Sequence, residues 1–201
     1  MILPPIIGIS SGDGRLDPIL AAIDAGLPAL ILREPCLSAR DAQRFVAALH
    51  PLLKENLIIH RKTSGADGFG LPIHLPGGVS PAPYISDARH VGVSAHSIAA
   101  LQTAQDAGCA YATYSPVYSP TSKPEDRRPT LGIAGFAAGA AAVTIPVVAL
   151  GGINAERAVN CFRAGAAAVA GIGAFFQPKE IRRLIAAGKR NVKWRSGVDA
   201  V

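Results

Sequence analysis

The stretch Pro146–Asn154, with the sequence PVVALGGIN, decides the fold. A short apolar run ends at Gly151 and Gly152, and Asn154 then offers a side chain that caps a helix well. A second segment, Ala168–Ala174 (AVAGIGA), repeats the order of apolar strand, glycines and helix. Glycine permits positive φ and lets backbone N–H groups approach an anion closely. These turns are therefore either a phosphate site or simply tight turns between strand and helix.

Six further apolar segments precede this pair, and helical segments alternate with them along the whole chain. Two strand–glycine–helix units near the C-terminus are typical of the last repeats of a (β/α)8 barrel, a fold that needs at least about 200 residues. We therefore predict a single-domain α/β (β/α)8 TIM barrel over residues 1–191 and a C-terminal tail over 192–201. A doubly wound open sheet is the alternative, but its glycine-rich loop usually lies near the N-terminus. The strands are expected at residues 6–10, 29–34, 57–62, 72–75, 90–96, 111–117, 146–150 and from 168 onward.

Capping residues mark where several helices begin. Ser38, Ser97 and Asn154 each stand just before a segment with helical spacing of apolar residues, and Asp17 is expected to cap the first helix, with Pro18 at its first position. The polar segment 118–130 has no such pattern, and its prolines and charges indicate a mobile lid.

The composition narrows the possible partners. The net charge of +6 suits an anionic ligand, but the Lys and Arg residues are spread along the chain without interleaved aromatic residues, so we expect no nucleic-acid binding. No apolar run is long enough to span a membrane, and the N-terminus lacks a signal-peptide pattern. The three cysteines are widely spaced, which favours free thiols and a cytoplasmic location.

Polar side chains gather where the expected strands end, the edge at which barrels of this kind carry their sites. Three histidines suit proton transfer near neutral pH, and the basic residues suit an anion. We predict no metal site, because Glu34 is the only acid at a strand end. The candidate residues from the strand ends and the following loop are Arg33, His60, Arg61, His74, Ser94, His96, Ser122 and Lys123.

The chain resembles the thiamine-phosphate synthase/TenI family of (β/α)8 proteins from the first strand to about Phe176. The matching stretches, each weak alone but specific in this order, are Leu32–Glu34 (LRE), Gly92–Ser97 (GVSAHS), Ser115–Tyr118 (SPVY) with Ser122–Pro124 (SKP), and Pro146–Ile153 (PVVALGGI). The resemblance implies a phosphorylated thiazole as ligand, with its phosphate on backbone groups of Gly151, Gly152, Gly171 and Ile172. It also implies that Arg33, Ser94, Ser122 and Lys123 hold the diphosphate and pyrimidine of a second substrate in the synthases.

Two departures from the synthase pattern favour the TenI-like branch of this family. Synthases carry Asn-Asp-Arg after the third strand and a second acid after the fourth, and these acids hold Mg²⁺. This chain has His60–Lys62 (HRK) and Leu75–Gly78 (LPGG) there, although Asp67 can be matched to the second run. The histidine linked to tautomerisation in some TenI proteins aligns with Pro116, so His60, His74 or His96 must move the proton.

The leading hypothesis is therefore a thiamine biosynthesis protein that binds a thiazole phosphate carboxylate beside Arg33 or Arg61 and isomerises it without a cofactor. The alternatives are a thiamine-phosphate synthase that uses Mg²⁺, and a non-catalytic protein that binds a phosphorylated ligand. A homodimer is possible in each case.

Overall fold

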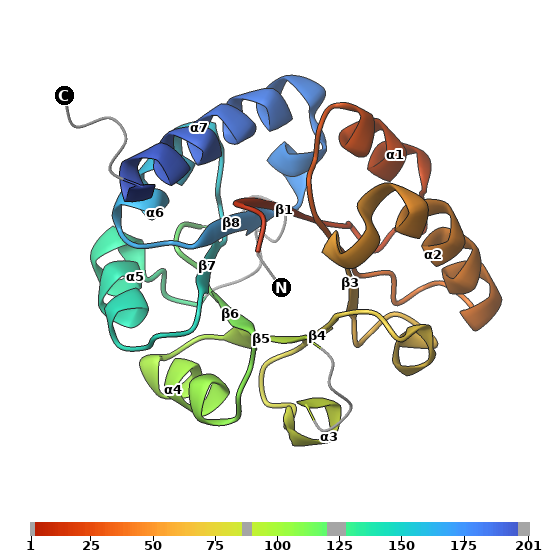
Figure 1. Ribbon diagram of the computed structural model, residues 1–201, viewed down its shortest axis with the longest axis horizontal. Helices are drawn as coiled ribbons and strands as arrows, with labels where there is room; N and C mark the ends of the chain where they lie inside the picture. The colour runs from red at the N-terminus through yellow and green to blue at the C-terminus, as the bar shows by residue number, and fades with distance from the viewer. Residues whose placement is uncertain (1–2, 86–89, 120–127, 197–201) are drawn as a thin grey trace.

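A closed barrel of eight parallel strands forms the centre of the molecule (Figure 1). The computed structural model describes residues 3–85, 90–119 and 128–196. Each strand pairs with the next along the chain, and β8 closes the barrel by pairing with β1 through Ile7 and Ala170. The predicted (β/α)8 fold is confirmed. The strands are β1 (Ile6–Ile9), β2 (Leu30–Leu32), β3 (Leu57–His60), β4 (Ile73–Leu75), β5 (Val91–Ala95), β6 (Tyr111–Tyr114), β7 (Val147–Leu150) and β8 (Ala168–Gly171).

Helices surround this ring of strands on the outside (Figure 1). The α-helices are α1 (Asp17–Asp24), α2 (Ala39–Leu53), α3 (Ala82–Ile85), α4 (Ile98–Asp106), α5 (Gly132–Ala141), α6 (Ala155–Arg163) and α7 (Pro178–Ser196). Short 3₁₀ turns are η1 (Lys54–Asn56), η2 (Ala66–Phe69) and η3 (Gly173–Phe176). Helix α7 continues past residue 191, where we placed the end of the barrel domain.

Side-chain caps fix three of these helices where the sequence predicts them. The oxygens of Ser38, Ser97 and Asn154 accept hydrogen bonds from backbone N–H groups in the first turns of α2, α4 and α6. The prediction for α1 is wrong by one residue. Leu16 occupies the N-cap position without a side-chain cap, and Asp17 is the first helical residue, where its carboxylate faces the positive end of the helix dipole.

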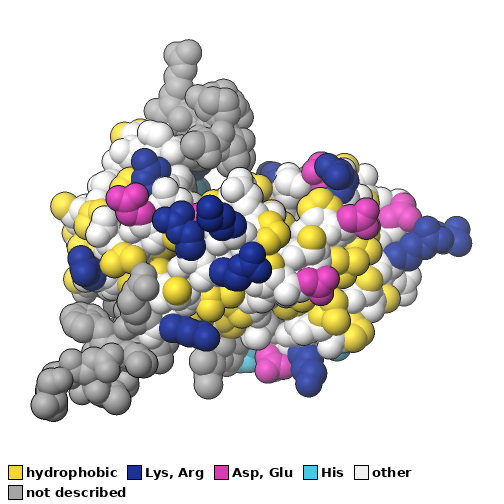
Figure 2. Space-filling model, turned by 90° about the horizontal axis from the view of Figure 1, so that it is seen from above, with side chains coloured by type: hydrophobic (Ala, Val, Ile, Leu, Met, Phe, Trp, Pro, Cys, Tyr) yellow, Lys and Arg dark blue, Asp and Glu magenta, His cyan; other side chains and the backbone are white. Residues whose placement is uncertain are grey.

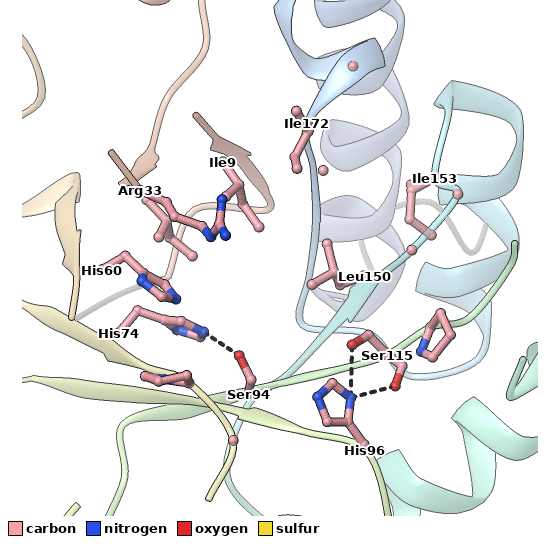
Figure 3. A pocket seen from close by; sticks show the side chains of 18 of the residues that line it. Ile9, Arg33, His60, His74, Ser94, His96, Ser115, Leu150, Ile153 and Ile172 are labelled. Carbon is pink, nitrogen blue, oxygen red and sulfur yellow. Dashed lines mark hydrogen bonds between the residues drawn. The ribbon is translucent and has the colours of Figure 1, made fainter. Parts of the chain in front are cut away.

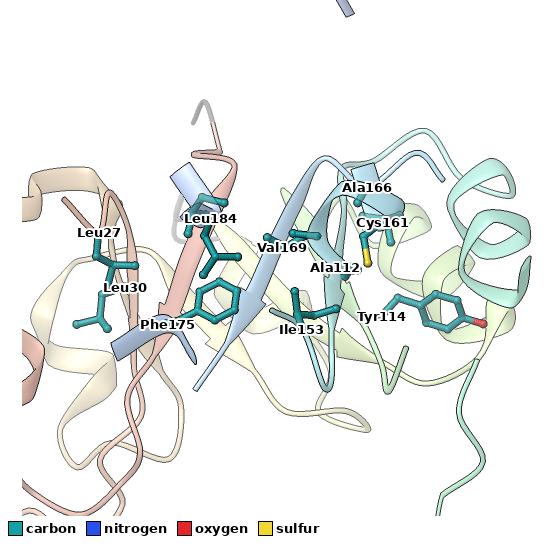
Figure 4. Packing of buried hydrophobic residues seen from close by; sticks show 14 of the residues in the cluster. Leu27, Leu30, Ala112, Tyr114, Ile153, Cys161, Ala166, Val169, Phe175 and Leu184 are labelled. Carbon is teal, nitrogen blue, oxygen red and sulfur yellow. The ribbon is translucent and has the colours of Figure 1, made fainter. Parts of the chain in front are cut away.

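Successive residues of each strand point alternately into the barrel and out toward the helices. Ile7, Ile31 and Val148 belong to the apolar cluster inside the barrel, whereas Ile6 and Leu30 belong to the larger cluster under the helices. Figure 4 shows part of that outer cluster, where Phe175 of η3 lies beside β8 with Leu184 of α7 above it. The continuous apolar strands of the sequence follow from this burial on both faces.

None of the described helices is long and apolar enough to cross a membrane. Helix α7 exposes Lys179, Arg182 and Arg183, while Ile181 and Leu184 are buried against the barrel. On the face seen in Figure 2, Lys and Arg side chains lie near the centre with acidic and hydrophobic side chains around them. The positive charge is thus mixed with other side chains on this face.

Candidate functional site

A cavity of about 430 Å³ opens at the carboxyl ends of the strands (Figure 3). Its volume is in the range of small-molecule sites. Nine of the predicted site residues line it together: Arg33, His60, His74, Ser94, His96, Gly151, Gly152, Gly171 and Ile172. Lys62 and Ser115, which lie at the ends of two predicted strands, line the cavity as well. So do Arg128, Arg157 and Gly173, which were not predicted as binding residues.

Three of the predicted residues are not placed in the cavity. Arg61 is directed away from it, because its Nε donates to the Tyr84 hydroxyl at 2.7 Å and its guanidinium pairs with Asp67 at 3.4 Å. These contacts raise the pKa of Arg61, with the Tyr84 hydrogen bond as the largest cause. Arg61 is therefore not among the residues that line the cavity, whereas its neighbour Lys62 is. Ser122 and Lys123 lie outside the described residues.

The cavity is lined by basic groups. Arg33, Lys62, Arg128 and Arg157 bring four cations to its wall, and none of the described lining residues is an Asp or Glu. A concave site with charge of one sign concentrates ligands of the opposite sign. The cavity is therefore suited to an anionic ligand.

On one side of the cavity the backbone turns sharply after β7. Gly151 and Gly152 have φ of 103° and 62°, and a Cβ on Gly152 would lie 2.5 Å from the carbonyl oxygen of Ser119. Only glycine fits here, because a side chain at positive φ is strained and the neighbouring backbone is too close. The tight turn predicted from the sequence is present.

Arg157 in the first turn of α6 covers this glycine turn. Its Nη1 donates to the carbonyl oxygen of Gly152 at 2.7 Å, and its guanidinium stacks 4.7 Å from the ring centre of Tyr118. These two contacts hold the cation at the cavity wall. The sequence did carry a signal for Arg157. Arg157 stands three residues after the N-cap Asn154, so it lies in the first turn of α6, next to the glycine turn that precedes the helix.

His74 is buried at the bottom of the cavity, and both of its ring nitrogens have partners. Nδ1 lies 2.9 Å from the Tyr111 hydroxyl and Nε2 lies 3.0 Å from the Ser94 hydroxyl. Burial, with a smaller contribution from His60, lowers the pKa of His74 to about 3. His74 is therefore a neutral imidazole near neutral pH.

His60 and His96 differ in how their protons are placed. Nδ1 of His60 accepts the backbone N–H of Lys62 at 3.1 Å, so a neutral His60 carries its proton on Nε2. Nδ1 of His96 lies 2.9 Å from the carbonyl oxygen of Ser115 and donates to it, while Nη1 of Arg128 lies 3.1 Å from both ring nitrogens. Figure 3 shows His60 beside His74 and Arg33, with His96 across the cavity beside Ser115. The guanidinium of Arg128 thus lies against the His96 ring.

Glu34 does not face the cavity, although it ends the second predicted strand. Its buried carboxylate accepts hydrogen bonds from the backbone N–H groups of Gly12 and Gly14. Within the described residues, no group of three His, Cys, Asp or Glu side chains could hold a metal ion.

The fold and the cavity define a class: a (β/α)8-barrel protein with a basic small-molecule site at the carboxyl ends of its strands. Residues 6–175 match the family model described as thiamine monophosphate synthase (TMP-TENI), and the chain belongs to this family. It is 33% identical over 170 residues, 79% of this chain and 70% of the relative, to the thiamine-phosphate synthase of Roseiflexus sp. (strain RS-1). It is 30% identical over 192 residues, 88% of this chain and 100% of the relative, to the putative thiamine-phosphate synthase 2 of Aquifex aeolicus (strain VF5).

A solved structure supports the fold. The thiamine phosphate pyrophosphorylase of Pyrococcus furiosus superposes with a TM-score of 0.77 at 19% identity, covering 94% of this chain and 97% of that one. At this identity the likeness concerns the architecture alone. The family predicted from the sequence motifs is confirmed. The curated relatives are named as synthases, which favours the synthase alternative over the isomerase that we placed first.

Proposed function

We propose that the protein is a thiamine-phosphate synthase that joins a thiazole phosphate to hydroxymethylpyrimidine diphosphate and releases diphosphate. The observation that supports this proposal is that the cavity wall carries groups suited to anions in two places. The glycine turn and Arg157 form one, and Arg33 with Lys62 forms the other, near the ends of β2 and β3. Two phosphorylated substrates that meet in one cavity need two such places, and the names of the relatives agree with this reaction.

The phosphate of the thiazole is assigned to the glycine turn. Backbone N–H groups reach an anion closely where no Cβ intervenes, and Gly173 after β8 has open space where a Cβ would stand. Arg157 adds a charge-assisted contact on the same side.

The diphosphate of the second substrate is assigned to the side of Arg33 and Lys62. In the reaction the bond between the pyrimidine methylene carbon and a diphosphate oxygen breaks, and the oxygen keeps the electron pair. The thiazole nitrogen then forms a bond to that carbon. Cations beside the departing oxygen stabilise the charge that develops there. The hydroxyl-bearing Ser94 lines the same cavity.

The family implies Mg²⁺ as a companion of the diphosphate, but the described residues do not fit this ion. Mg²⁺ needs carboxylate oxygens, and the cavity wall presents imidazoles, guanidinium groups and an amine. Glu34 is bound to two backbone N–H groups, and Asp67 is paired with Arg61. No step of the proposed reaction is therefore assigned to a metal.

Isomerisation of a thiazole phosphate carboxylate is the second candidate. It is favoured by His60, whose neutral ring carries a proton on Nε2 at the cavity wall, and by the absence of acids among the described lining residues. Moving one proton within a substrate needs a proton carrier and no metal. His60→Asn should then abolish aromatisation and leave binding of the phosphorylated thiazole intact.

The two-site proposal is tested by measuring which substrate's KM changes when each cation is removed. Arg157→Gln should raise KM for the thiazole phosphate about 10-fold or more and leave KM for the pyrimidine diphosphate nearly unchanged. Arg33→Gln should do the reverse. Arg163→Gln in the last turn of α6 and Arg40→Gln in α2, both exposed, are matched controls. Equal effects of Arg157→Gln and Arg33→Gln on both substrates would contradict the two-site assignment.

A further inference from the structure

We propose that Tyr111 is a positioning residue: its buried hydroxyl fixes the tautomer of His74, and His74 in turn directs the Ser94 proton into the cavity. The three groups form a single hydrogen-bonded chain from the barrel interior to the cavity wall, across β6, β4 and β5. The assignment of the protons concerns the free protein, whereas its effect on turnover rests on the proposed function.

The chain begins with a tyrosine that has no access to solvent. Tyr111 is fully buried inside the barrel, and Gly92 on the neighbouring strand makes room for it. A Cβ on Gly92 would lie 2.1 Å from the phenol ring. Burial raises the pKa of Tyr111, so the hydroxyl keeps its proton.

That proton has one acceptor among the described residues. Nδ1 of His74 lies 2.9 Å from the hydroxyl oxygen, and Tyr111 has no second hydrogen-bond partner in the described part of the chain. A buried O–H group without an acceptor costs free energy. The hydroxyl therefore donates to Nδ1, and the single proton of the neutral His74 ring must sit on Nε2.

The remaining links follow from this tautomer. Nε2–H of His74 donates to the Ser94 oxygen at 3.0 Å. Ser94 thus accepts this hydrogen bond, and its own hydroxyl proton is available for another acceptor. Ser94 lines the cavity, and Figure 3 shows its hydroxyl between His74 and the open space. Ser94 thus presents a donor to a ligand oxygen. With the opposite tautomer, Ser94 would donate to Nε2 and present only lone pairs.

The tautomer can be read directly in the free protein. The ¹⁵N chemical shifts of His74 should show a protonated Nε2 and an unprotonated Nδ1 at neutral pH. A protonated Nδ1 would overturn the proposal, whatever the protein turns out to catalyse. If no substrate is converted, this result still stands or fails by itself.

A double-mutant cycle tests whether Tyr111 acts through Ser94. Tyr111→Phe keeps the ring that fills the barrel and removes only the hydroxyl, and we expect it to lower kcat/KM about 10-fold. Ser94→Ala should lower it at least as much, and adding Tyr111→Phe to Ser94→Ala should change it no further. If the losses of kcat/KM from the two single substitutions multiplied in the double variant, Tyr111 would act without Ser94, and the proposal would be overturned.

Tyr114→Phe on the same strand is the matched control. Tyr114 points out of the barrel and packs against Phe136, with ring centres 6.1 Å apart, so loss of its hydroxyl should leave kcat/KM unchanged. Thermal unfolding of all variants separates a local loss of the hydroxyl from misfolding.

Discussion

The carboxylate of Glu34 lies 2.8 Å from the backbone nitrogen of Gly14, and this contact binds the end of β2 to the loop that follows β1. A second N–H, that of Gly12, donates to the other oxygen at 3.2 Å. The backbone N–H of Glu34 itself donates to Thr63, whose hydroxyl donates to the carbonyl oxygen of Leu32. Glu34 therefore joins the three loops that follow β1, β2 and β3. Its carboxylate binds backbone N–H groups of the protein itself.

Removal of this acid should destabilise the fold. Glu34→Ala leaves two backbone donors without their charged acceptor, and we expect the free energy of unfolding to fall by about 2–3 kcal/mol. Glu34→Gln keeps one acceptor oxygen and should lose less. Urea denaturation measures both. An unchanged midpoint for Glu34→Ala would show that the loop does not depend on this carboxylate.

His74 should make stability depend on pH in a defined window. Its folded pKa of about 3 lies below the ordinary value of 6.5, so between these values the unfolded chain binds more protons than the folded one. The contribution of His74 is complete above pH 6.5 and is lost as pH falls toward 3. The slope is at most about 1.4 kcal/mol per pH unit. His74→Gln should flatten the pH dependence of unfolding in this window, and an unaltered slope would contradict the burial of a neutral His74.

The two glycine positions at the proposed phosphate site should behave differently. Gly152→Ala places a Cβ at positive φ beside Ser119, so it should cost about 2 kcal/mol or more in stability and also weaken ligand binding. A Cβ on Gly173 meets nothing within 4 Å, so Gly173→Ala should leave stability nearly unchanged. If the phosphate lies against β8, Gly173→Ala should still weaken binding of the thiazole phosphate. Calorimetric titration and thermal unfolding separate the two effects.

Thr113 offers a substitution that should increase stability. Its hydroxyl is buried inside the described barrel without a hydrogen-bond partner. Thr113→Val has nearly the same shape and removes the unpaired group, so the free energy of unfolding should rise by about 1 kcal/mol. Thr113→Ser keeps the hydroxyl and loses a methyl group, and should lower stability instead. Destabilisation by Val would indicate a buried partner for the hydroxyl.

Much of the fold was predictable because apolar strands, glycine turns and capping residues are local signals. Asn154 after Gly151 and Gly152 marked the start of α6. The ends of the parallel strands meet at one edge of the barrel, so Arg33, His60 and His74 line one cavity. These predictions succeeded because side chains alternate along each strand, so that every second residue points into the barrel.

The direction of side chains beyond the strand ends was not predictable. Arg61 and Lys62 follow β3 as consecutive cations, and only the positions of Tyr84 and Asp67 decide that Arg61 turns outward. Arg157 was missed because its contact with Tyr118 depends on a loop that is distant in sequence. Likewise, the role of Tyr111 depends on the glycine opposite it on β5.

The central claim is best tested by one assay on the purified protein. Thiazole phosphate and hydroxymethylpyrimidine diphosphate are supplied together, with Mg²⁺ in one arm and a chelator in the other, and thiamine phosphate is measured. Our account predicts thiamine phosphate in both arms, because Arg33 and Lys62 line the described cavity and no Asp or Glu does. Thiamine phosphate in the Mg²⁺ arm alone would contradict the metal-free reaction. No thiamine phosphate in either arm, while thiazole phosphate carboxylate supplied alone became aromatic, would contradict the synthase proposal as a whole.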